Sequence, residues 1–250
     1  MKGTLTVFSG IPFGPDEPYN YPQAKRLLGL LRDELRRDKR LKRRLRIDPQ
    51  SPGRGAITGR QSDLVWDFIG LEVMRRAKVF TQYPHLTVGI HADRVDAYVT
   101  VPNAIKSRLR AALLGNDYAD FEHRILEVAR GIGSALRSAK GATPMIVIVQ
   151  RHYPSQRATP VHDSLLRFDP RTAMSLAHGG KAVVKSQPQW LRATYDALRS
   201  RRSNLQFQVG AQFPYGSCPT VRSRQLIGVI ANVWLACKPI VDATTERRTR

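Results

Sequence analysis

Three segments of the chain alternate strictly between apolar and polar side chains, at residues 86–90, 95–101 and 205–213. This two-residue period is typical of a β-strand that buries one face and leaves the other polar. Such strands form antiparallel sheets, and their apolar face must be covered by other elements. The alternation therefore predicts an antiparallel or mixed sheet with helices on one side.

The remaining elements follow from hydrophobic periodicity and from turn residues. Residues 145–149 are apolar on both faces, which predicts a central strand. Further strands are expected at 4–8 and 161–168, and helices at 62–78, 104–114, 118–139, 189–201 and 222–241. We therefore predict a single α+β domain over residues 1–250, with a mixed, mainly antiparallel sheet and with helices packed on one face.

A further helix is expected at about 23–46, and its two halves differ in character. Four leucines form an apolar stripe in the first half, whereas eight of the eleven residues from Arg36 to Arg46 are Lys or Arg. Like charges at i,i+3 and i,i+4 destabilise an isolated helix, which favours a bound anion over a merely solvated face. We predict a protruding basic helix, followed by a mobile loop at about 49–61.

The charge of the whole chain points to the same kind of partner. Lys and Arg number 41 against 20 Asp and Glu, for a formal net charge of +21. A polyanion compensates such charge, and each cation placed on a nucleic-acid phosphate releases a condensed counterion. A membrane surface and an acidic protein partner are the alternatives that the charge leaves open.

We therefore expect a nucleic-acid-binding protein, either an RNA or single-strand binding subunit or an accessory factor that works with other protein subunits. The polar sheet face carries Tyr98 and three glutamines, which suit stacking and base-edge contacts, so RNA or single-stranded DNA is favoured over duplex DNA. The expected contact residues are Arg36, Arg37, Lys39, Arg40, Lys42, Arg43, Arg44, Arg46, Arg54, Arg60, Tyr98, Arg151, Arg222 and Arg224.

Two histidines share a short pattern on expected strands. His85 with Thr87, and His162 with Ser164, both fit H-x-(S/T)-apolar. On a strand, residues i and i+2 lie on the same face, so each pair would present an imidazole beside a hydroxyl. The pattern resembles the two-histidine (2H) phosphoesterases. That resemblance implies an alternative function, a metal-independent phosphodiesterase or ribonuclease with general acid and base histidines.

Other classes of function receive no support from the residues. The two cysteines make neither a disulfide framework nor a metal-ligand set, and the acidic residues do not form a two-metal cluster. We therefore expect no metal and no cofactor. No apolar run approaches the roughly 20 residues that span a bilayer, and the N-terminus lacks the apolar core of a signal peptide, so we expect a cytoplasmic protein without a membrane partner.

Besides a nucleic-acid-binding protein and a phosphoesterase, a third possible function is that of a scaffold subunit that docks an acidic protein.

Overall fold

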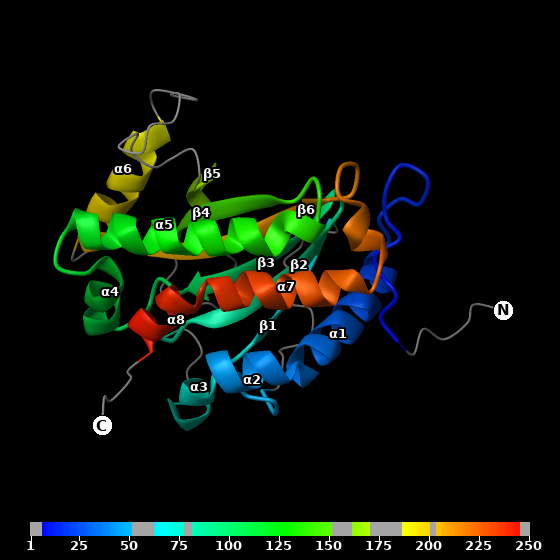
Figure 1. Ribbon diagram of the computed structural model, residues 1–250, viewed down its shortest axis with the longest axis horizontal. Coiled ribbons are helices and arrows are strands. Elements are labelled where there is room, and N and C mark those ends of the chain that lie inside the picture. The colour runs from blue at the N-terminus through cyan, green and yellow to red at the C-terminus, as the bar shows by residue number, and fades with distance from the viewer. Residues whose placement is uncertain are drawn as a thin grey trace.

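A computed structural model of the chain describes residues 7–51, 63–77, 82–151, 162–170, 187–200 and 204–245. At its centre lies a six-stranded sheet in the order β1-β2-β3-β6-β4-β5, in which every neighbouring pair is antiparallel (Figure 1). The strands are β1 Leu64–Ile69, β2 His85–His91, β3 Arg94–Val101, β4 Thr143–Arg151, β5 His162–Phe168 and β6 Leu205–Pro214. The α+β prediction is confirmed, and the described sheet is purely antiparallel.

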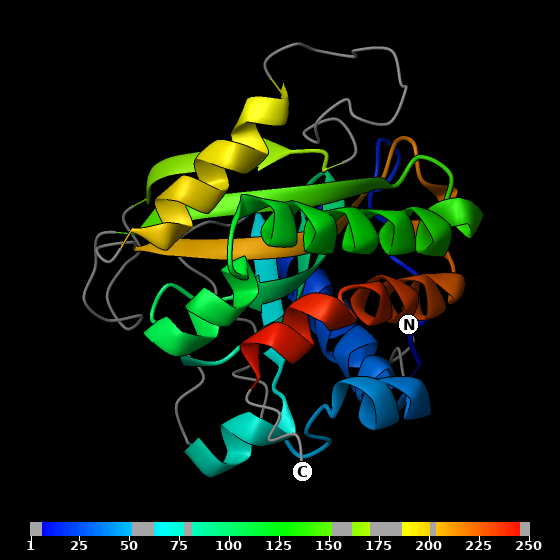
Figure 2. The same ribbon diagram turned by 60° about the vertical axis from the view of Figure 1, so that its left-hand side comes forward.

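Three helices lie side by side across one face of this sheet, as Figures 1 and 2 show from two directions. α1 packs on β1 and β2, α7 packs on β3 and β6, and α5 packs on β4 and against α7. The described helices are α1 Tyr21–Arg37, α2 Lys39–Leu45, α3 Glu72–Ala77, α4 Ser107–Leu114, α5 Tyr118–Ala135, α6 Gln187–Arg199, α7 Gln225–Ala236 and α8 Lys238–Thr244. A continuous apolar cluster fills the space between these helices and the sheet.

The last strand joins the two halves of the sheet. β6 pairs with β3 on one side and with β4 on the other, so it lies between strands that precede it in the chain. Gly210 permits this insertion, because a Cβ there would lie 2.0 Å from the Ala97 carbonyl oxygen and 2.8 Å from Tyr98 Cα. Any other residue at this position would force β3 and β6 apart.

The region predicted as a helix at 62–78 is instead β1 followed by the short helix α3. The spacing of its apolar residues 64, 65, 68 and 69 also fits one face of a helix. The periodicity therefore predicted a helix where the chain forms a strand. All six residues of β1 pair with β2, so contact with the neighbouring strand decides the conformation. In the strand expected at 4–8, residues 7 and 8 are not in a strand, and residues 4–6 lie outside the described part of the chain.

The predicted basic helix at 23–46 is two helices, separated by Asp38. Asp38 has an extended conformation (φ −61°, ψ 115°), and its Oδ1 accepts hydrogen bonds from the backbone N–H groups of Arg40 and Leu41 at 2.7 and 3.3 Å. It is therefore the N-cap of α2. This second helix does not protrude, because Leu41 and Leu45 are buried and it packs against α7 and α8. From residue 52 on, the expected mobile loop lies outside the described residues.

The final helical region is also divided, since α7 ends at Ala236 and α8 begins at Lys238. Pro239 in the first turn of α8 has no N–H to continue α7, so the chain must break there. Within the described ranges, no individual helix combines the length and apolar character needed to cross a membrane. Among the described helices, only α7 and α8 taken together meet those criteria, and a bend of 51° separates the two.

Candidate nucleic-acid interface

The helix α2 exposes its cations because its two leucines are anchored in the core. Leu41 and Leu45 are one helical turn apart, and only 0% and 3% of their surface is exposed. With that face turned inward, the remaining positions point to solvent, and the exposed cations are Lys39, Arg40, Lys42, Arg43, Arg44 and Arg46. The core thus fixes the orientation of a helix whose outer surface is almost entirely basic.

Three arginines, one within α2 and two beside it, are held in place by acidic and amide groups. Arg37 and Arg224 both pair with Glu34, at 3.4 and 3.2 Å, which brings α1 and the start of α7 together. Arg40 pairs with Asp38 at 2.7 Å. Arg40 also donates a hydrogen bond to Asn232 Oδ1 of α7 at 2.7 Å. These contacts fix the arginines, but they also partly neutralise them.

The electrostatics of Asp38 follow from the same contacts. Burial raises the pKa of its carboxyl, but hydrogen bonds from the Arg40 guanidinium and from the backbone N–H groups of Arg40 and Leu41 outweigh this effect. The net result is a pKa below its ordinary value of 3.8. Asp38 is therefore ionised at neutral pH, where it both caps α2 and pairs with Arg40.

Five cations of this region make no ion pair with any described residue, and we call them the basic face: Lys39, Lys42, Arg43, Arg44 and Arg46. They lie on one short helix and its C-cap, so they span about 10 Å along the helix axis. Three of them occupy the last turn, where the helix dipole favours positive charge. The basic face can therefore place several cations on neighbouring phosphates without first breaking an intramolecular pair.

The other predicted phosphate contacts are less well placed. Arg36 is half-buried, and its Nη2 donates a hydrogen bond to the Pro49 carbonyl oxygen at 2.8 Å. Arg222 is exposed beside the Pro12 carbonyl, to which it donates a hydrogen bond at 3.3 Å. Arg54 and Arg60 lie outside the described residues, and Arg151 is described only as backbone at the end of β4.

The polar sheet face does not offer an open stacking surface. The register places Tyr98 between Thr87 and Gly210 on this face, as the alternation predicts. However, only 4% of Tyr98 is exposed, it packs with Val147 and Val149, and burial raises its pKa well above the usual value. Beside it, Thr87 and Thr100 share a hydrogen bond of 2.8 Å. Stacking of a base on Tyr98 would require this face to open first.

The two histidine pairs are not brought together. They lie on β2 and β5, which are four strand positions apart in the sheet, or roughly 19 Å at the usual spacing. His85 is buried against the ring of Phe68, with 5.0 Å between ring centroids, and its Nδ1 lies 3.2 Å from the Tyr83 carbonyl oxygen. Thr87 is also buried. For His162 and Ser164 the structure describes only the backbone. The strand order thus separates the two histidine-bearing strands, and side-chain positions are described for only one of the two pairs.

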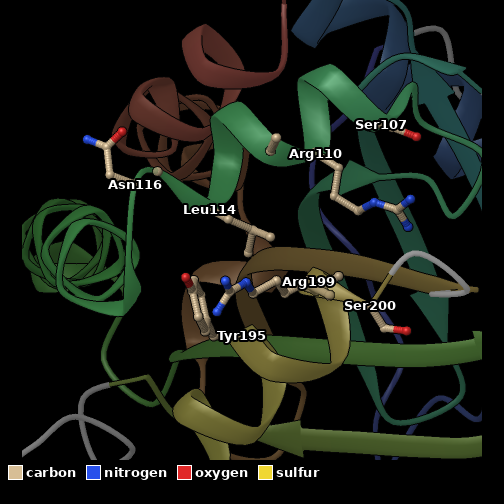
Figure 3. Close-up of a pocket in the computed structure, with 10 residues that line it drawn as sticks. Ser107, Arg110, Leu114, Asn116, Tyr195, Arg199 and Ser200 are labelled. Carbon is tan, nitrogen blue, oxygen red and sulfur yellow. The ribbon is translucent and has the colours of Figure 1, made fainter.

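A pocket of about 410 Å³ lies between α4 and α6 (Figure 3). Its lining includes the polar residues Ser107, Arg110, Asn116, Tyr195, Arg199 and Ser200. In Figure 3 the guanidinium groups of Arg110 and Arg199 point in different directions, so they do not converge on one anion. Across the described part of the chain, no group of three or more His, Cys, Asp or Glu residues is arranged to hold a metal ion.

Comparison with known protein families, with curated proteins and with solved structures found no match to this chain. The residues themselves must therefore identify the function. The basic run is evident in the sequence, but the residues that order it in the fold are not predicted from it, namely Glu34, Asp38 and Asn232. Of these, only Asp38 carried a local signal, because an aspartate before a short helical run is a typical N-cap.

Proposed function

We propose that the protein binds nucleic acid through the basic face of α2. The observation that carries this proposal is the presence of five exposed cations without carboxylate partners among the described residues, on a helix anchored by two buried leucines. A fixed concentration of charge destabilises the free protein by self-repulsion, and a polyanion removes this cost. The net charge of +21 supports the same class of partner.

The size of the expected effect follows from counterion release. If all five cations contact duplex phosphates, log K should fall with log salt concentration with a slope of about −4.5. Raising the salt from 50 to 200 mM should then weaken binding about 500-fold. Contacts of this kind carry no information about base sequence, so different sequences should respond alike.

The proposal is tested with a triple variant of the basic face, Lys42→Gln, Arg43→Gln and Arg44→Gln. A matched control removes the same number of positive charges from exposed residues on and just beyond α5: Arg130→Gln, Arg137→Gln and Lys140→Gln. α5 packs on the opposite side of α7 from α2 (Figure 1). Binding of a labelled oligonucleotide is measured by fluorescence anisotropy over a range of salt concentrations.

We expect the triple variant to bind more weakly and to reduce the magnitude of the salt slope by about 2.7, since each lost contact contributes about 0.9. The control should change the slope by less than about one unit. An equal loss of affinity in the triple variant and in the control would show that net charge, not the basic face, drives binding. Unchanged binding by the triple variant would refute the proposal outright.

A further inference from the structure

We infer that the basic face binds the backbone of a double helix in preference to an unpaired strand. This inference rests on the proposed function and specifies its substrate class. It reverses the sequence-based preference for single strands, which depended on an accessible polar sheet face. Three features of the described residues support it: the burial of that sheet face, the rigidity of α2 and the density of its charge.

The first feature is the location of the aromatic rings. Proteins that hold single strands gain much of their affinity by stacking bases on aromatic side chains. The register places three rings on the polar sheet face. Tyr98, packed with Val147 and Val149, and Phe68 are each 4% exposed, and Trp66 is half-buried. Along the described ranges every Phe, Tyr and Trp is buried or half-buried. The basic face carries no aromatic ring, so charge placed on phosphates is its main source of affinity.

The second feature is the rigidity of the helix that carries the charge. α2 is anchored by Leu41 and Leu45 in the core, capped by Asp38 and tied to α7 through the bond from Arg40 to Asn232. When a rigid helix docks on a rigid duplex, only the Lys and Arg side chains have to be ordered, and the two backbones lose little conformational entropy. A flexible single strand would have to be ordered along the helix, which costs free energy on binding.

The third feature is the linear density of charge. The basic face spans about 10 Å, and duplex DNA carries one phosphate charge per about 1.7 Å of axis, so about six charges, counted over both strands, fall within that length of duplex. One strand alone offers about half that density. Five contacts give expected salt slopes of about −4.5 for a duplex and about −3.5 for a single strand. The preference for duplex should therefore grow about tenfold for each tenfold dilution of salt.

The experiment compares three fluorescent probes of 20 nucleotides or base pairs with the full chain: a DNA duplex, an RNA duplex and a mixed-sequence single-stranded DNA that cannot self-pair. Dissociation constants are measured between 50 and 200 mM salt. We expect the duplexes to bind about tenfold more tightly than the single strand at 100 mM and to show a slope steeper by about one unit. In the triple variant of the basic face this difference should shrink.

Each outcome distinguishes the inference from the proposed function. A single strand that binds as tightly as the duplexes, or more tightly, overturns the inference and leaves nucleic-acid binding intact. Failure of all three probes overturns both. Equal binding of the two duplexes supports recognition of the shared phosphate backbone. Binding of only one duplex supports the inference and identifies DNA or RNA as the source of that backbone.

Discussion

Arg32 Nη1 donates a hydrogen bond of 2.6 Å to Asp67 Oδ2, and this contact ties α1 to β1 inside the core. Only 2% of the Asp67 side chain and 18% of the Arg32 side chain are exposed. Burial lowers the pKa of Arg32, but hydrogen bonds to Asp67 and Asp33 outweigh this effect and hold the pKa above its usual value. Arg32 therefore stays charged, and its removal would leave the buried Asp67 side chain without this ion-pair partner.

Replacing Arg32 with Leu should destabilise the protein by about 3–5 kcal/mol, because it leaves the Asp67 carboxylate buried and unpaired. The double variant Arg32→Leu, Asp67→Leu should recover most of this loss, since two apolar residues replace the pair. Urea unfolding of the wild type, both single variants and the double variant gives the coupling energy. A coupling energy near zero would mean that the two side chains do not depend on one another.

The lowered pKa of Asp38 gives the protein a component of stability that depends on pH. A carboxyl whose folded pKa lies below the unfolded value stabilises the folded state above that value, and the stabilisation is lost as pH falls through the folded pKa. The variant Asp38→Asn keeps a side chain that can cap α2 but loses the charge. The wild type should therefore exceed this variant in free energy of unfolding above about pH 5, and the difference should disappear at lower pH.

Urea titrations of the wild type and of Asp38→Asn at several values between about pH 7 and about pH 2.5 measure this difference. Asp196, which is exposed and pairs with the equally exposed Arg192 on α6, provides a control position, Asp196→Asn. The control should show little change at any pH, because an exposed pair contributes little. If the free energies of unfolding of the wild type and of Asp38→Asn differ by the same amount at every pH, the charge of Asp38 does not contribute to stability.

Two glycines should respond to alanine in opposite directions. Gly141 has a φ of +86°, and a Cβ there would lie 1.8 Å from the Ser217 carbonyl oxygen, so Gly141→Ala should cost more than about 1 kcal/mol. Gly133 lies within α5, where an added Cβ would meet nothing within 4 Å, so Gly133→Ala should stabilise by about 0.5–1 kcal/mol. Thermal unfolding of the two variants provides the comparison, and a shift in the same direction for both would contradict it.

A bound duplex should stabilise the folded protein. Because a ligand that binds only the folded state shifts the unfolding equilibrium, a 20-base-pair DNA duplex at about 100 times its Kd should add about 2.7 kcal/mol. Differential scanning fluorimetry at 50 mM salt measures the rise in Tm. The triple variant of the basic face should show a smaller rise at the same duplex concentration. An equal rise would place the contact elsewhere on the molecule.

Much of the fold can be predicted from local sequence patterns. The predictions fail where a pattern fits two structures and contacts between distant residues decide between them. The alternating strands β2, β3 and β6 are predictable because a period of two has no helical counterpart. β1 is not, since Leu64, Val65, Phe68 and Ile69 fit both periods and only pairing with β2 selects the strand. At Asp38 the only sequence signal for a break is the N-cap preference of aspartate, because the apolar stripe continues through residues 41 and 45 and the periodicity conceals a change of helix.

The candidate interface is predictable in composition but not in detail. The run from Arg36 to Arg46 is evident in the sequence, yet which cations are already paired depends on distant residues. Glu34 and Arg224 are 190 positions apart, and Arg40 and Asn232 are 192 apart. Similarly, alternation assigns Tyr98 to the polar face, but it cannot tell whether that face is covered.

The attachment of α2 to the core also has a kinetic consequence. Since the helix is already formed and oriented before any ligand arrives, no folding step has to precede or follow the encounter. Association should then be governed by diffusion in the field of the cations, with rate constants approaching about 10⁸ M⁻¹ s⁻¹ in dilute buffer. The same association rate constants should fall steeply as salt is added.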